Sequence, residues 1–570
     1  MKSLFKPFFV TIIVVLTLLL SLSTFVLPAV QQKTAGDEVF SAERAMAHVE
    51  RIAAKTHPVG SSEQKDVRDY LITAIAEMGF QPELHEGFGE NDAEGILGFV
   101  PYAGELENIY FRLEGAGNTN HDILMLAHYD STFGGPGAAD DASGVAALLE
   151  TARALKAQAP PLNDIVFLFT DGEEAELLGS KLFAEQEGIM KNVNLVMNFE
   201  SRGRTGPSIL FETSDQNGWL MKEFSKVAPY PVAYSFSSDV YKMVSNVTDF
   251  TPFKMAGKRG FNFSNLGGME IYHNTQDTPE NLDQGFLQHQ GLYALSLAKH
   301  FGNIPLDGGQ NSDDAVFFTL ARSVMALYSV QWNIPLTAFL LMLLAAALIL
   351  VFRKHLVTAK GVLKGFLASL FSIIVAAVFG IAVQLLFTGI YFQLDKVHSI
   401  SELVDFRRML IFQGNTWIVF SLVLSFALLF LLQRLFIKKA TGIHLLLGNL
   451  VVWSILAVMS AFALPGAAYM FQWPVMLTLA GLLVDIFLCR AAAPKYRATF
   501  VLSTLACMLI FLPVGYLLYQ SLTMLAGGVP IALLSIPASL MMITVSIYAG
   551  KTSSLSAMVF NTKTSKKQAI

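Results

Sequence analysis

The sequence predicts an α/β domain with a central mixed, mostly parallel sheet flanked by helices, followed by an all-α multi-span transmembrane domain. Two observations predict this division. Three short apolar runs lie in the middle of the chain, with a helical segment between the first two, which is the alternation of an α/β fold. Seven longer apolar stretches dominate the rest of the chain, and each approaches or exceeds the length that spans a bilayer.

The composition supports two kinds of region. Of the 570 residues, 53% are hydrophobic and only 15% are charged, and the mean hydropathy is +0.48. The apolar excess lies at the two ends, whereas residues 37–301 read as an ordinary globular domain. The net charge of -5 is small for this length and gives no reason to expect nucleic acid. Cys489 and Cys507 lie in apolar stretches, so the globular region has no thiolate for a disulfide, a nucleophile or a metal.

The chain begins with Lys2 and Lys6, and an apolar run follows from about residue 8 to residue 30. A cleaved signal peptide also begins with positive charge, but its apolar core is usually about 7–15 residues long. This run is longer and is about long enough to cross a bilayer. We therefore expect a signal-anchor helix at residues 1–32.

The globular region is expected at residues 33–305. Helical periodicity is seen at 41–55 and 61–79, buried strands are expected at 123–127, 165–169 and 195–199, and a helix is expected at about 144–157. In such sheets, sites form at the carboxyl ends of the strands. All three strands run directly into acidic or histidine-bearing segments. A polar stretch rich in Gly and Asp then leads into a linker, which we place at residues 306–332.

About seven transmembrane helices are expected within residues 333–550. The apolar stretches lie at about 333–352, 363–391, 410–433, 443–463, 467–488, 499–519 and 524–549. Their interiors are almost free of charge, and Asp485 is the exception. Basic clusters, including the tail at 551–570, fall on one side together with Lys2 and Lys6, and the positive-inside rule makes that side cytoplasmic. The globular domain is then extracytoplasmic. We expect the bacterial plasma membrane, with an organelle membrane and a lumenal domain as the alternative.

His128 and Asp130 stand at the end of the first strand. Alternate strand residues point the same way, so both side chains can face one site. A metal-bound histidine usually donates its other ring N–H to a carboxylate or a carbonyl, and Asp130 could be that carboxylate. A chance His-x-Asp in a surface loop is the alternative interpretation.

Acidic residues gather in the next two segments. Asp140 and Asp141 precede a helix, and a capping role explains one carboxylate but not two. A carboxylate shared between two cations would explain the other. Asp171, Glu173 and Glu174 follow the second strand, and such crowding costs Coulomb energy unless cations or solvent relieve it. A solvated acidic turn is the alternative.

Two further segments are weak signals alone: Glu200 ends the third strand, and His273 follows a tyrosine. The ordered set is specific. His-x-Asp, Asp-Asp-x-Ser-Gly, Asp-Gly-Glu-Glu, a strand ending in Glu, and Tyr-His-x-x-x-Asp-Thr-Pro together resemble the di-zinc aminopeptidase family of bacterial leucyl aminopeptidase and glutamate carboxypeptidase. The similarity covers about residues 41–283 and implies a zinc-peptidase sandwich. The flanking membrane segments, with stretches 198–203 and 248–253, resemble the branch containing endoplasmic reticulum metallopeptidase and vacuolar membrane protease.

The resemblance implies two Zn²⁺ per chain and a role for each matching residue. His128 and Glu200 would bind one zinc, Glu174 and His273 would bind the other, and Asp140 would bridge them. Glu173 would be the general base, and Asp130 would orient His128. The peptide bond between Asp140 and Asp141 stands where the family often has a cis bond. Glu200 stands where the soluble aminopeptidases commonly carry Asp, and both residues occur in the family.

The expected function is that of a membrane-anchored metallopeptidase, with aminopeptidase action as the first expectation. Its partners would be a peptide substrate and the lipid bilayer, and the sequence gives no indication of oligomeric state. The alternatives are a single-zinc glutaminyl cyclase on the same fold and a non-catalytic receptor or scaffold. A transporter role for the membrane half is disfavoured because its helices lack the buried charges of an ion pathway. An anchor or a substrate-guiding platform fits better.

Overall fold

The structure is a computed structural model that divides into two compact units. One unit is Thr24–Val330, and the other joins residues 1–23 to residues 331–570. The described residues are 7–95, 98–117, 119–242, 247–307, 312–394, 419–436, 442–488, 497–521 and 528–549. The predicted basic tail at 551–570, together with Lys2 and Lys6, lies outside these residues.

A mixed seven-stranded sheet forms the centre of the first unit, in the order β1-β2-β4-β3-β5-β7-β6. Its strands are β1 (Glu83–Gly95), β2 (Gly98–Leu113), β3 (Asp122–His128), β4 (Asp164–Thr170), β5 (Val193–Phe199), β6 (Ile209–Thr213) and β7 (Gly260–Ser264). The four central strands β4, β3, β5 and β7 run parallel, whereas β1, β2 and β6 pair antiparallel at the edges. The predicted mixed, mostly parallel sheet is confirmed, and the three predicted strands are β3, β4 and β5.

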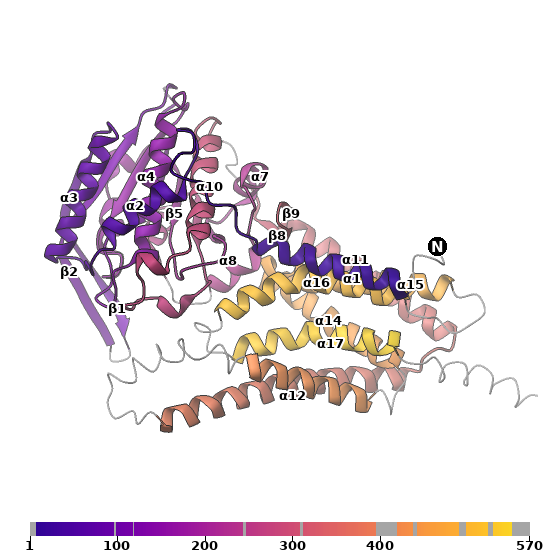
Figure 1. The fold of residues 1–570 in the computed structure, drawn as a ribbon. Helices are drawn as coiled ribbons and strands as arrows, with labels where there is room; N and C mark the ends of the chain where they lie inside the picture. Colours follow the sequence, from indigo (N-terminus) through magenta and orange to yellow (C-terminus); the bar gives the residue numbers. More distant parts are fainter. Residues whose placement is uncertain are drawn as a thin grey trace, which may run out of the picture. The chain divides into compact units, whose positions relative to one another are not determined.

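Helices cover both faces of this sheet, because its central strands are apolar on both sides. In β3, Met125 packs into the larger core cluster, whereas its neighbours Leu124 and Leu126 pack into a separate cluster on the other face. Figure 1 shows α2, α4 and α10 side by side on one face, and contacts join all three pairs of these helices. On the other face α5 and α9 contact each other, and α9 packs on β5 and β7.

The helices predicted at 41–55, 61–79 and 144–157 are confirmed as α2, α3 and α4. The first two begin after Ser41 and Ser61, whose side chains accept a hydrogen bond from a backbone N–H in the first turn. The α-helices of the unit are α2 (Ala42–Ile52), α3 (Ser62–Glu77), α4 (Ser143–Lys156), α5 (Leu178–Ala184), α6 (Glu187–Met190), α7 (Gly218–Val227), α8 (Ser235–Tyr241), α9 (Phe250–Met255) and α10 (Gln284–Phe301).

A β-hairpin occupies part of the segment predicted to be a linker at residues 306–332. Strands β8 (Ala315–Ala321) and β9 (Val324–Ser329) pair antiparallel, and the backbone of Phe318 bridges to Tyr234 of the same unit. The apolar residues that begin β8 are buried, including Val316 and Phe317. The Gly- and Asp-rich composition that indicated a linker is confined to the residues before β8, whereas the hairpin residues are apolar enough to join the core.

The second unit consists of apolar helices. Among the described residues, six helices are long and apolar enough to cross a membrane. The helices of this unit are α1 (Pro7–Leu22), α11 (Asn333–Arg353), α12 (Ala359–Leu394), a helix at Val419–Phe436, α14 (Gly442–Ala463), α15 (Tyr469–Leu488), α16 (Arg497–Ser521) and α17 (Gly528–Ala549). Each predicted span overlaps one of them, although the predicted start at residue 410 lies outside the described residues.

The first helix is shorter than the apolar run that predicted it. α1 ends at Leu22, a 3-10 turn covers Ser23–Phe25, and no helix continues into residues 26–30. Pro28 contributes to this end, because a proline disfavours helical geometry in the residue before it. The apolar residues 26–30 therefore continue the chain without regular secondary structure.

Polar side chains in the membrane unit link its helices. Gln472 on α15 donates to Thr337 Oγ1 on α11 at 2.9 Å, and Asn449 on α14 donates to Ser539 Oγ on α17 at 3.0 Å. Asp485 accepts hydrogen bonds from the backbone N–H groups of Ala498 and Thr499 at 3.1 and 2.8 Å. The one acidic residue noted in these apolar stretches thus caps the start of α16.

Candidate metal centre

The predicted site residues lie where neighbouring strands end. His128 is the last residue of β3, and the turn after β4 carries Glu173 and Glu174. Glu200 directly follows β5, and His273 lies two residues after the 3-10 turn η3 (Met269–Ile271). Because β3, β4 and β5 run parallel, their carboxyl ends meet at one edge of the sheet. Segments far apart in the sequence are thereby brought together.

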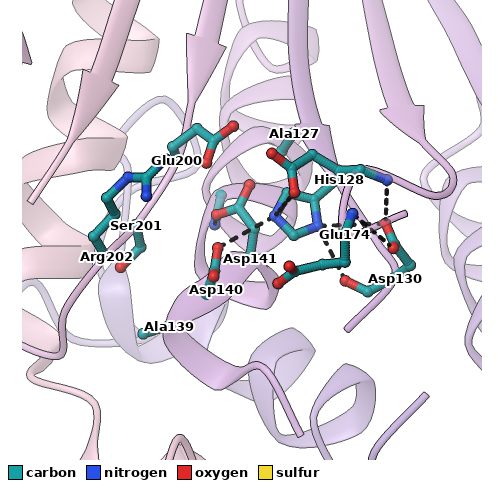
Figure 2. Close-up of polar contacts among 12 residues, drawn as sticks. Ala127, His128, Asp130, Ala139, Asp140, Asp141, Glu174, Glu200, Ser201 and Arg202 are labelled. Carbon is teal, nitrogen blue, oxygen red and sulfur yellow. Dashed lines mark hydrogen bonds and ion pairs between the residues drawn. The ribbon is translucent and has the colours of Figure 1, made fainter. Parts of the chain in front are cut away.

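Asp140 lies between two imidazoles. Its Oδ1 is 3.2 Å from Nε2 of His128, and its Oδ2 is 3.1 Å from Nε2 of His273. Glu174 Oε1 is 3.2 Å from the same nitrogen of His273. Ligand atoms of His128, Asp140 and Glu174 lie within 4.8 Å of one another, and Figure 2 shows these side chains converging. One carboxylate thus faces two histidines with separate oxygens.

The orientation of His128 is set from its other ring nitrogen. Nδ1 lies 3.0 Å from the backbone carbonyl of Asp130 and 3.4 Å from its carboxylate. A carbonyl can only accept, so Nδ1 carries a proton there and Nε2 is the ring nitrogen that would bind a metal ion. Nε2 points toward Asp140. Asp130, which was expected to orient His128, therefore lies close to Nδ1. The shorter of the two distances is to its backbone carbonyl and the longer is to its carboxylate.

The carboxylate of Asp130 is engaged mainly by the turn that follows β4. It accepts the backbone N–H of Glu173 at 3.0 Å through Oδ1 and that of Glu174 at 3.2 Å through Oδ2. Asp130 is 1% exposed, so these hydrogen bonds form away from bulk water. They fix the backbone from which both glutamate side chains project. Asp130 thus links the histidine on β3 to the acidic turn after β4.

The two adjacent aspartates have different contacts. Asp141 Oδ1 accepts the backbone N–H of Gly144 at 3.1 Å at the start of α4, whereas Asp140 makes no such contact and faces the imidazoles. The Asp140–Asp141 peptide bond is cis, in agreement with the family pattern. A Cβ on Gly144 would lie 2.5 Å from the Asp141 carboxylate and from the Phe199 carbonyl, so α4 and β5 approach closely here.

The loop that carries His273 is tied to the segment that carries Asp140. Asp277 accepts the backbone N–H groups of Ala139 and Asp140 at 2.7 and 3.2 Å, one with each carboxylate oxygen. A Cβ on Gly135 would lie 2.0 Å from the Asn274 carbonyl, so the preceding loop also lies directly against this one. His273 has a φ of 58°, an uncommon conformation for a residue with a side chain.

Glu200 and Glu173 complete the set. Glu200 is 3% exposed, and Figure 2 shows it on the side of Asp140 away from Glu174. Glu173 Oε2 lies 4.0 Å from Nε2 of His128. The side chain of Glu173 is 13% exposed and that of His273 is 31% exposed, whereas that of His128 is 1% exposed. Solvent therefore reaches the site from the Glu173 and His273 side.

The electrostatics of the site favour cation binding. Burial and repulsion from the Glu200 carboxylate raise the pKa of Glu173 well above its usual range. Burial raises the pKa of Glu174 to about 7, although His273 opposes the shift. Burial disfavours the charged form of His273, yet the carboxylates of Glu174 and Asp140 raise its pKa to about 9. Carboxylates crowded in a low-dielectric region retain protons unless a cation offsets their charge.

Three residues beside this cluster had no assigned role in the sequence analysis. They are Asp277, described above, and Asp249 and Arg202, which stand in the stretches that resemble the membrane-embedded branch. Asp249 is fully buried and accepts from Thr170 Oγ1, and burial raises its pKa to about 7. Arg202 donates to the Tyr272 hydroxyl at 3.0 Å, and the Tyr272 ring stacks on His273 with centroids 3.7 Å apart. Their motif membership was the only available signal.

The donor set fits zinc. Imidazole nitrogens and carboxylate oxygens are zinc ligands, and the segment from residue 24 to residue 330 contains no cysteine. With Nδ1 of His128 held by the backbone carbonyl of Asp130, Nε2 is the nitrogen that would bind an ion. Asp140 presents its two oxygens in two directions. These features suit metal binding at Asp140.

Comparison with known proteins defines the class of this domain as a peptidase. Residues 108–298 match the family model of peptidase family M28. The chain therefore carries a peptidase family M28 domain. The chain is similar to the vacuolar membrane protease of Vanderwaltozyma polyspora, with 28% identity over 297 residues that cover 49% of this chain and 31% of that protein. It is 26% identical to endoplasmic reticulum metallopeptidase 1 of Homo sapiens over 294 residues, covering 49% and 32%.

The matched part of the chain thus spans about a third of the length of these curated relatives. Among solved structures, the aminopeptidase from Aneurinibacillus sp. strain AM-1 is 13% identical, with a TM-score of 0.39, over 46% of this chain and 95% of that one. The glutaminyl cyclase of Porphyromonas gingivalis is 19% identical, with a TM-score of 0.36, over 46% and 98%. The relatives carry the names of vacuolar and endoplasmic reticulum membranes, so the expected bacterial plasma membrane finds no support among them.

Proposed function

We propose that this chain is a membrane-anchored di-zinc aminopeptidase that releases N-terminal residues from peptides. The observation that carries the proposal is the position of Asp140, whose two oxygens face Nε2 of His128 and Nε2 of His273 separately. In this assignment His128 and Glu200 hold one ion and Glu174 and His273 hold the other. Asp140 is shared between them. The M28 match supports metallopeptidase chemistry, and the aminopeptidase specificity is part of the proposal.

Glu173 is proposed as the general base. When bound, zinc ions supply Lewis acidity and lower the pKa of water toward about 7. The Glu173 carboxylate takes the proton of the water that attacks the peptide carbonyl, and it then passes that proton to the departing amine nitrogen. Its backbone N–H is held by Asp130 Oδ1 at 3.0 Å, which keeps the base in place. Its burial is suited to this work, because a raised carboxylate pKa helps it return the proton.

A glutaminyl cyclase on the same fold is the second candidate, since it resembles this family but uses one zinc. The proposed ligands His128 and Glu200 for one ion, and Glu174 and His273 for the other, are all present. This favours two ions and therefore peptide hydrolysis. A non-catalytic scaffold is disfavoured because all five proposed ligands and the proposed base are present. Cyclisation of an N-terminal glutamine peptide, compared with release of a free N-terminal residue, separates the two enzymes.

The second unit is proposed to fix the enzyme in an organelle membrane, with the peptidase unit on the lumenal side. Six apolar helices in the described residues and the relatives from the vacuole and the endoplasmic reticulum support this. The lumenal orientation follows from basic residues such as Arg353 and Lys354 at the end of α11. We also propose that α1 is an uncleaved anchor, that the peptidase domain covers 33–305, and that residues 551–570 form a cytoplasmic tail.

The test is digestion of a peptide library by the full-length chain in detergent, with and without a chelator, read by mass spectrometry. We expect products shortened by single residues from the N-terminus, and we expect the chelator to abolish them. Products of internal cleavage would contradict the aminopeptidase assignment and indicate an endopeptidase. Full activity in the chelator after complete metal removal would end the metallopeptidase proposal.

Glu173→Gln tests the proposed base. The substitution keeps the shape of the side chain but removes the group that accepts the proton, so activity should fall by about 10²-fold or more. Zinc content, measured by elemental analysis, should remain near that of the wild type, because Glu173 is not a proposed ligand. Wild-type turnover in this variant would remove Glu173 from the role.

A further inference from the structure

A row of buried polar side chains leads away from Glu200 across three adjacent strands. The sheet register places Asn198 of β5 opposite Asn262 of β7, and Asn262 opposite Glu212 of β6. Asn198 and Asn262 are fully buried, and Glu212 is 3% exposed. At the far end Lys254 from α9 donates to Glu212 Oε1 at 2.7 Å. The row thus begins beside a proposed metal ligand and ends at a lysine.

Each amide nitrogen in this row makes two hydrogen bonds. Nδ2 of Asn198 donates to Glu200 Oε1 at 3.1 Å and to Asn262 Oδ1 at 3.0 Å. Nδ2 of Asn262 donates to Glu212 Oε2 and to Thr248 Oγ1, both at 2.8 Å. If the Asn198 amide were turned over, its oxygen would meet two acceptor oxygens. The chemistry of its neighbours therefore sets its orientation, and Asn262 and Glu212 hold that orientation from behind.

This arrangement acts on one oxygen of Glu200. The bond from Asn198 engages Oε1, which leaves Oε2 as the oxygen available to bind a metal ion. Burying an amide is unfavourable by about 1–3 kcal/mol unless its hydrogen bonds are made, so two buried asparagines in the sheet need such partners. Outer partners of metal ligands commonly fix the geometry of those ligands.

We propose that Asn198, Asn262 and Glu212 are positioning residues that orient the Glu200 carboxylate and thereby set the affinity of the metal ion held by His128 and Glu200. The proposal rests on the proposed function, because it assumes that Glu200 is a zinc ligand. It makes a selective claim. Loss of these hydrogen bonds should weaken the binding of the ion assigned to His128 and Glu200. Binding of the ion assigned to Glu174 and His273 should be unchanged.

Asn198→Asp is the first test. It preserves shape but replaces the donor by an acceptor that faces both Glu200 and Asn262. The full-length chain in detergent is stripped with a chelator and titrated with zinc against a chromophoric chelator. The wild type should bind two equivalents. The variant should bind one of them about 10–100-fold more weakly and the other unchanged.

Asn163→Asp is the matched control. Asn163 is 1% exposed and donates to the carbonyls of Phe301 and Ile304 at 2.8 Å, just before β4 begins and so at the opposite end of that strand from the site. This variant should lose thermal stability and yet bind both zinc equivalents as the wild type does. A loss of one zinc equivalent in this control as well would show that general destabilisation explains the effect, and the proposal would fall.

A double substitution tests the row itself. Asn262→Asp alone sets a carboxylate against Glu212, and Glu212→Gln alone disturbs the acceptor shared by Asn262 and Lys254, so each should weaken the same ion. In the double variant, the carboxylate at position 262 can accept from Asn198 and from the new amide at position 212. The amide oxygen there can still accept from Lys254. We expect the double variant to recover affinity relative to the Asn262→Asp variant, as coupled residues do.

The outcomes separate the two proposals. A wild-type chain that binds fewer than two zinc ions contradicts the proposed di-zinc function. A wild type that binds two, with an Asn198→Asp variant that binds both with unchanged affinity, overturns the positioning role alone. Equal weakening of both ions in Asn198→Asp, or additive losses in the double variant, would also overturn it.

Discussion

Asp485 in the membrane unit and Asp140 in the peptidase unit are both buried carboxylates, but their partners differ. Asp485 accepts two backbone N–H groups and the hydroxyl of Thr499, which donates at 2.7 Å, so hydrogen-bond donors of a helix start surround it. Asp140 faces two imidazole nitrogens, and its neighbours include the carboxylate of Glu174. Burial is common to both residues, whereas only Asp140 is surrounded by other metal-binding groups.

The partners of a buried carboxylate indicate whether it stabilises the fold or binds a cation. A carboxylate whose oxygens are engaged by backbone donors stabilises the fold, and its removal affects a local helix start. A carboxylate that shares its surroundings with acids and imidazoles costs Coulomb energy unless a cation is bound. The adjacent Asp141 and Asp140 repeat the contrast within two residues, because Asp141 caps α4. The predictions below test this distinction.

The largest effect is expected for Asp140→Asn compared with Asp141→Asn. The first removes the charge proposed to be shared by both ions, so zinc content should fall and activity should drop by more than the about 10²-fold expected for loss of the base. The second keeps a side-chain oxygen that can accept the N–H of Gly144. It should retain zinc and lose far less activity. Elemental analysis and peptide turnover measure both, and equal zinc loss in the two variants would contradict the contrast.

A smaller effect is expected on the pH dependence of folding stability, and it comes from His289. This buried histidine is not a proposed metal ligand. Its Nδ1 accepts the Ser208 N–H at 3.1 Å, and burial lowers its pKa from 6.5 to about 4. Between these values the unfolded chain binds more protons than the folded chain. Its contribution to stability is complete above pH 6.5 and is lost as the pH falls toward 4, by about 3 kcal/mol.

Thermal unfolding measured from pH 7 to pH 4 checks this. The wild type should lose stability over that range, and His289→Gln should be less stable at pH 7 but show a shallower decline. A parallel decline in both proteins would assign the acid sensitivity to other groups.

The smallest effect is expected for Asp485→Ala. It removes the cap of α16 and should destabilise the membrane unit by about 1–2 kcal/mol, because three donors lose their acceptor. Peptide turnover per folded molecule should be unchanged, because Asp485 is not part of the proposed site. Unfolding in detergent and the turnover assay measure these outcomes. A loss of turnover at unchanged stability would give this carboxylate a functional role.

Part of the site could be predicted from residues that follow recognisable strands. His128, Glu174 and Glu200 each stand just after a buried apolar run, and the parallel arrangement of those runs predicts that their ends meet. The contacts of Asp277 and Asn262 could not be predicted in this way. Asp277 accepts hydrogen bonds from backbone N–H groups that are 137 and 138 residues away in the sequence. Asn262 contacts residues on neighbouring strands of the sheet. Such partners are chosen by sheet order and loop position, which no local pattern encodes.

The amino-acid sequence by itself determined the division into an α/β region and apolar helices, because hydrophobic periodicity and run length are local properties. It also supplied the ordered acidic and histidine motifs from which the metal ligands are proposed. Only the tertiary structure decided that Asp140 and Asp141 have different partners, that residues 315–329 form a hairpin, and that Asn198 contacts Glu200. These outcomes depend on which side chains meet after distant segments pack, and that is decided by the free energy of the whole fold.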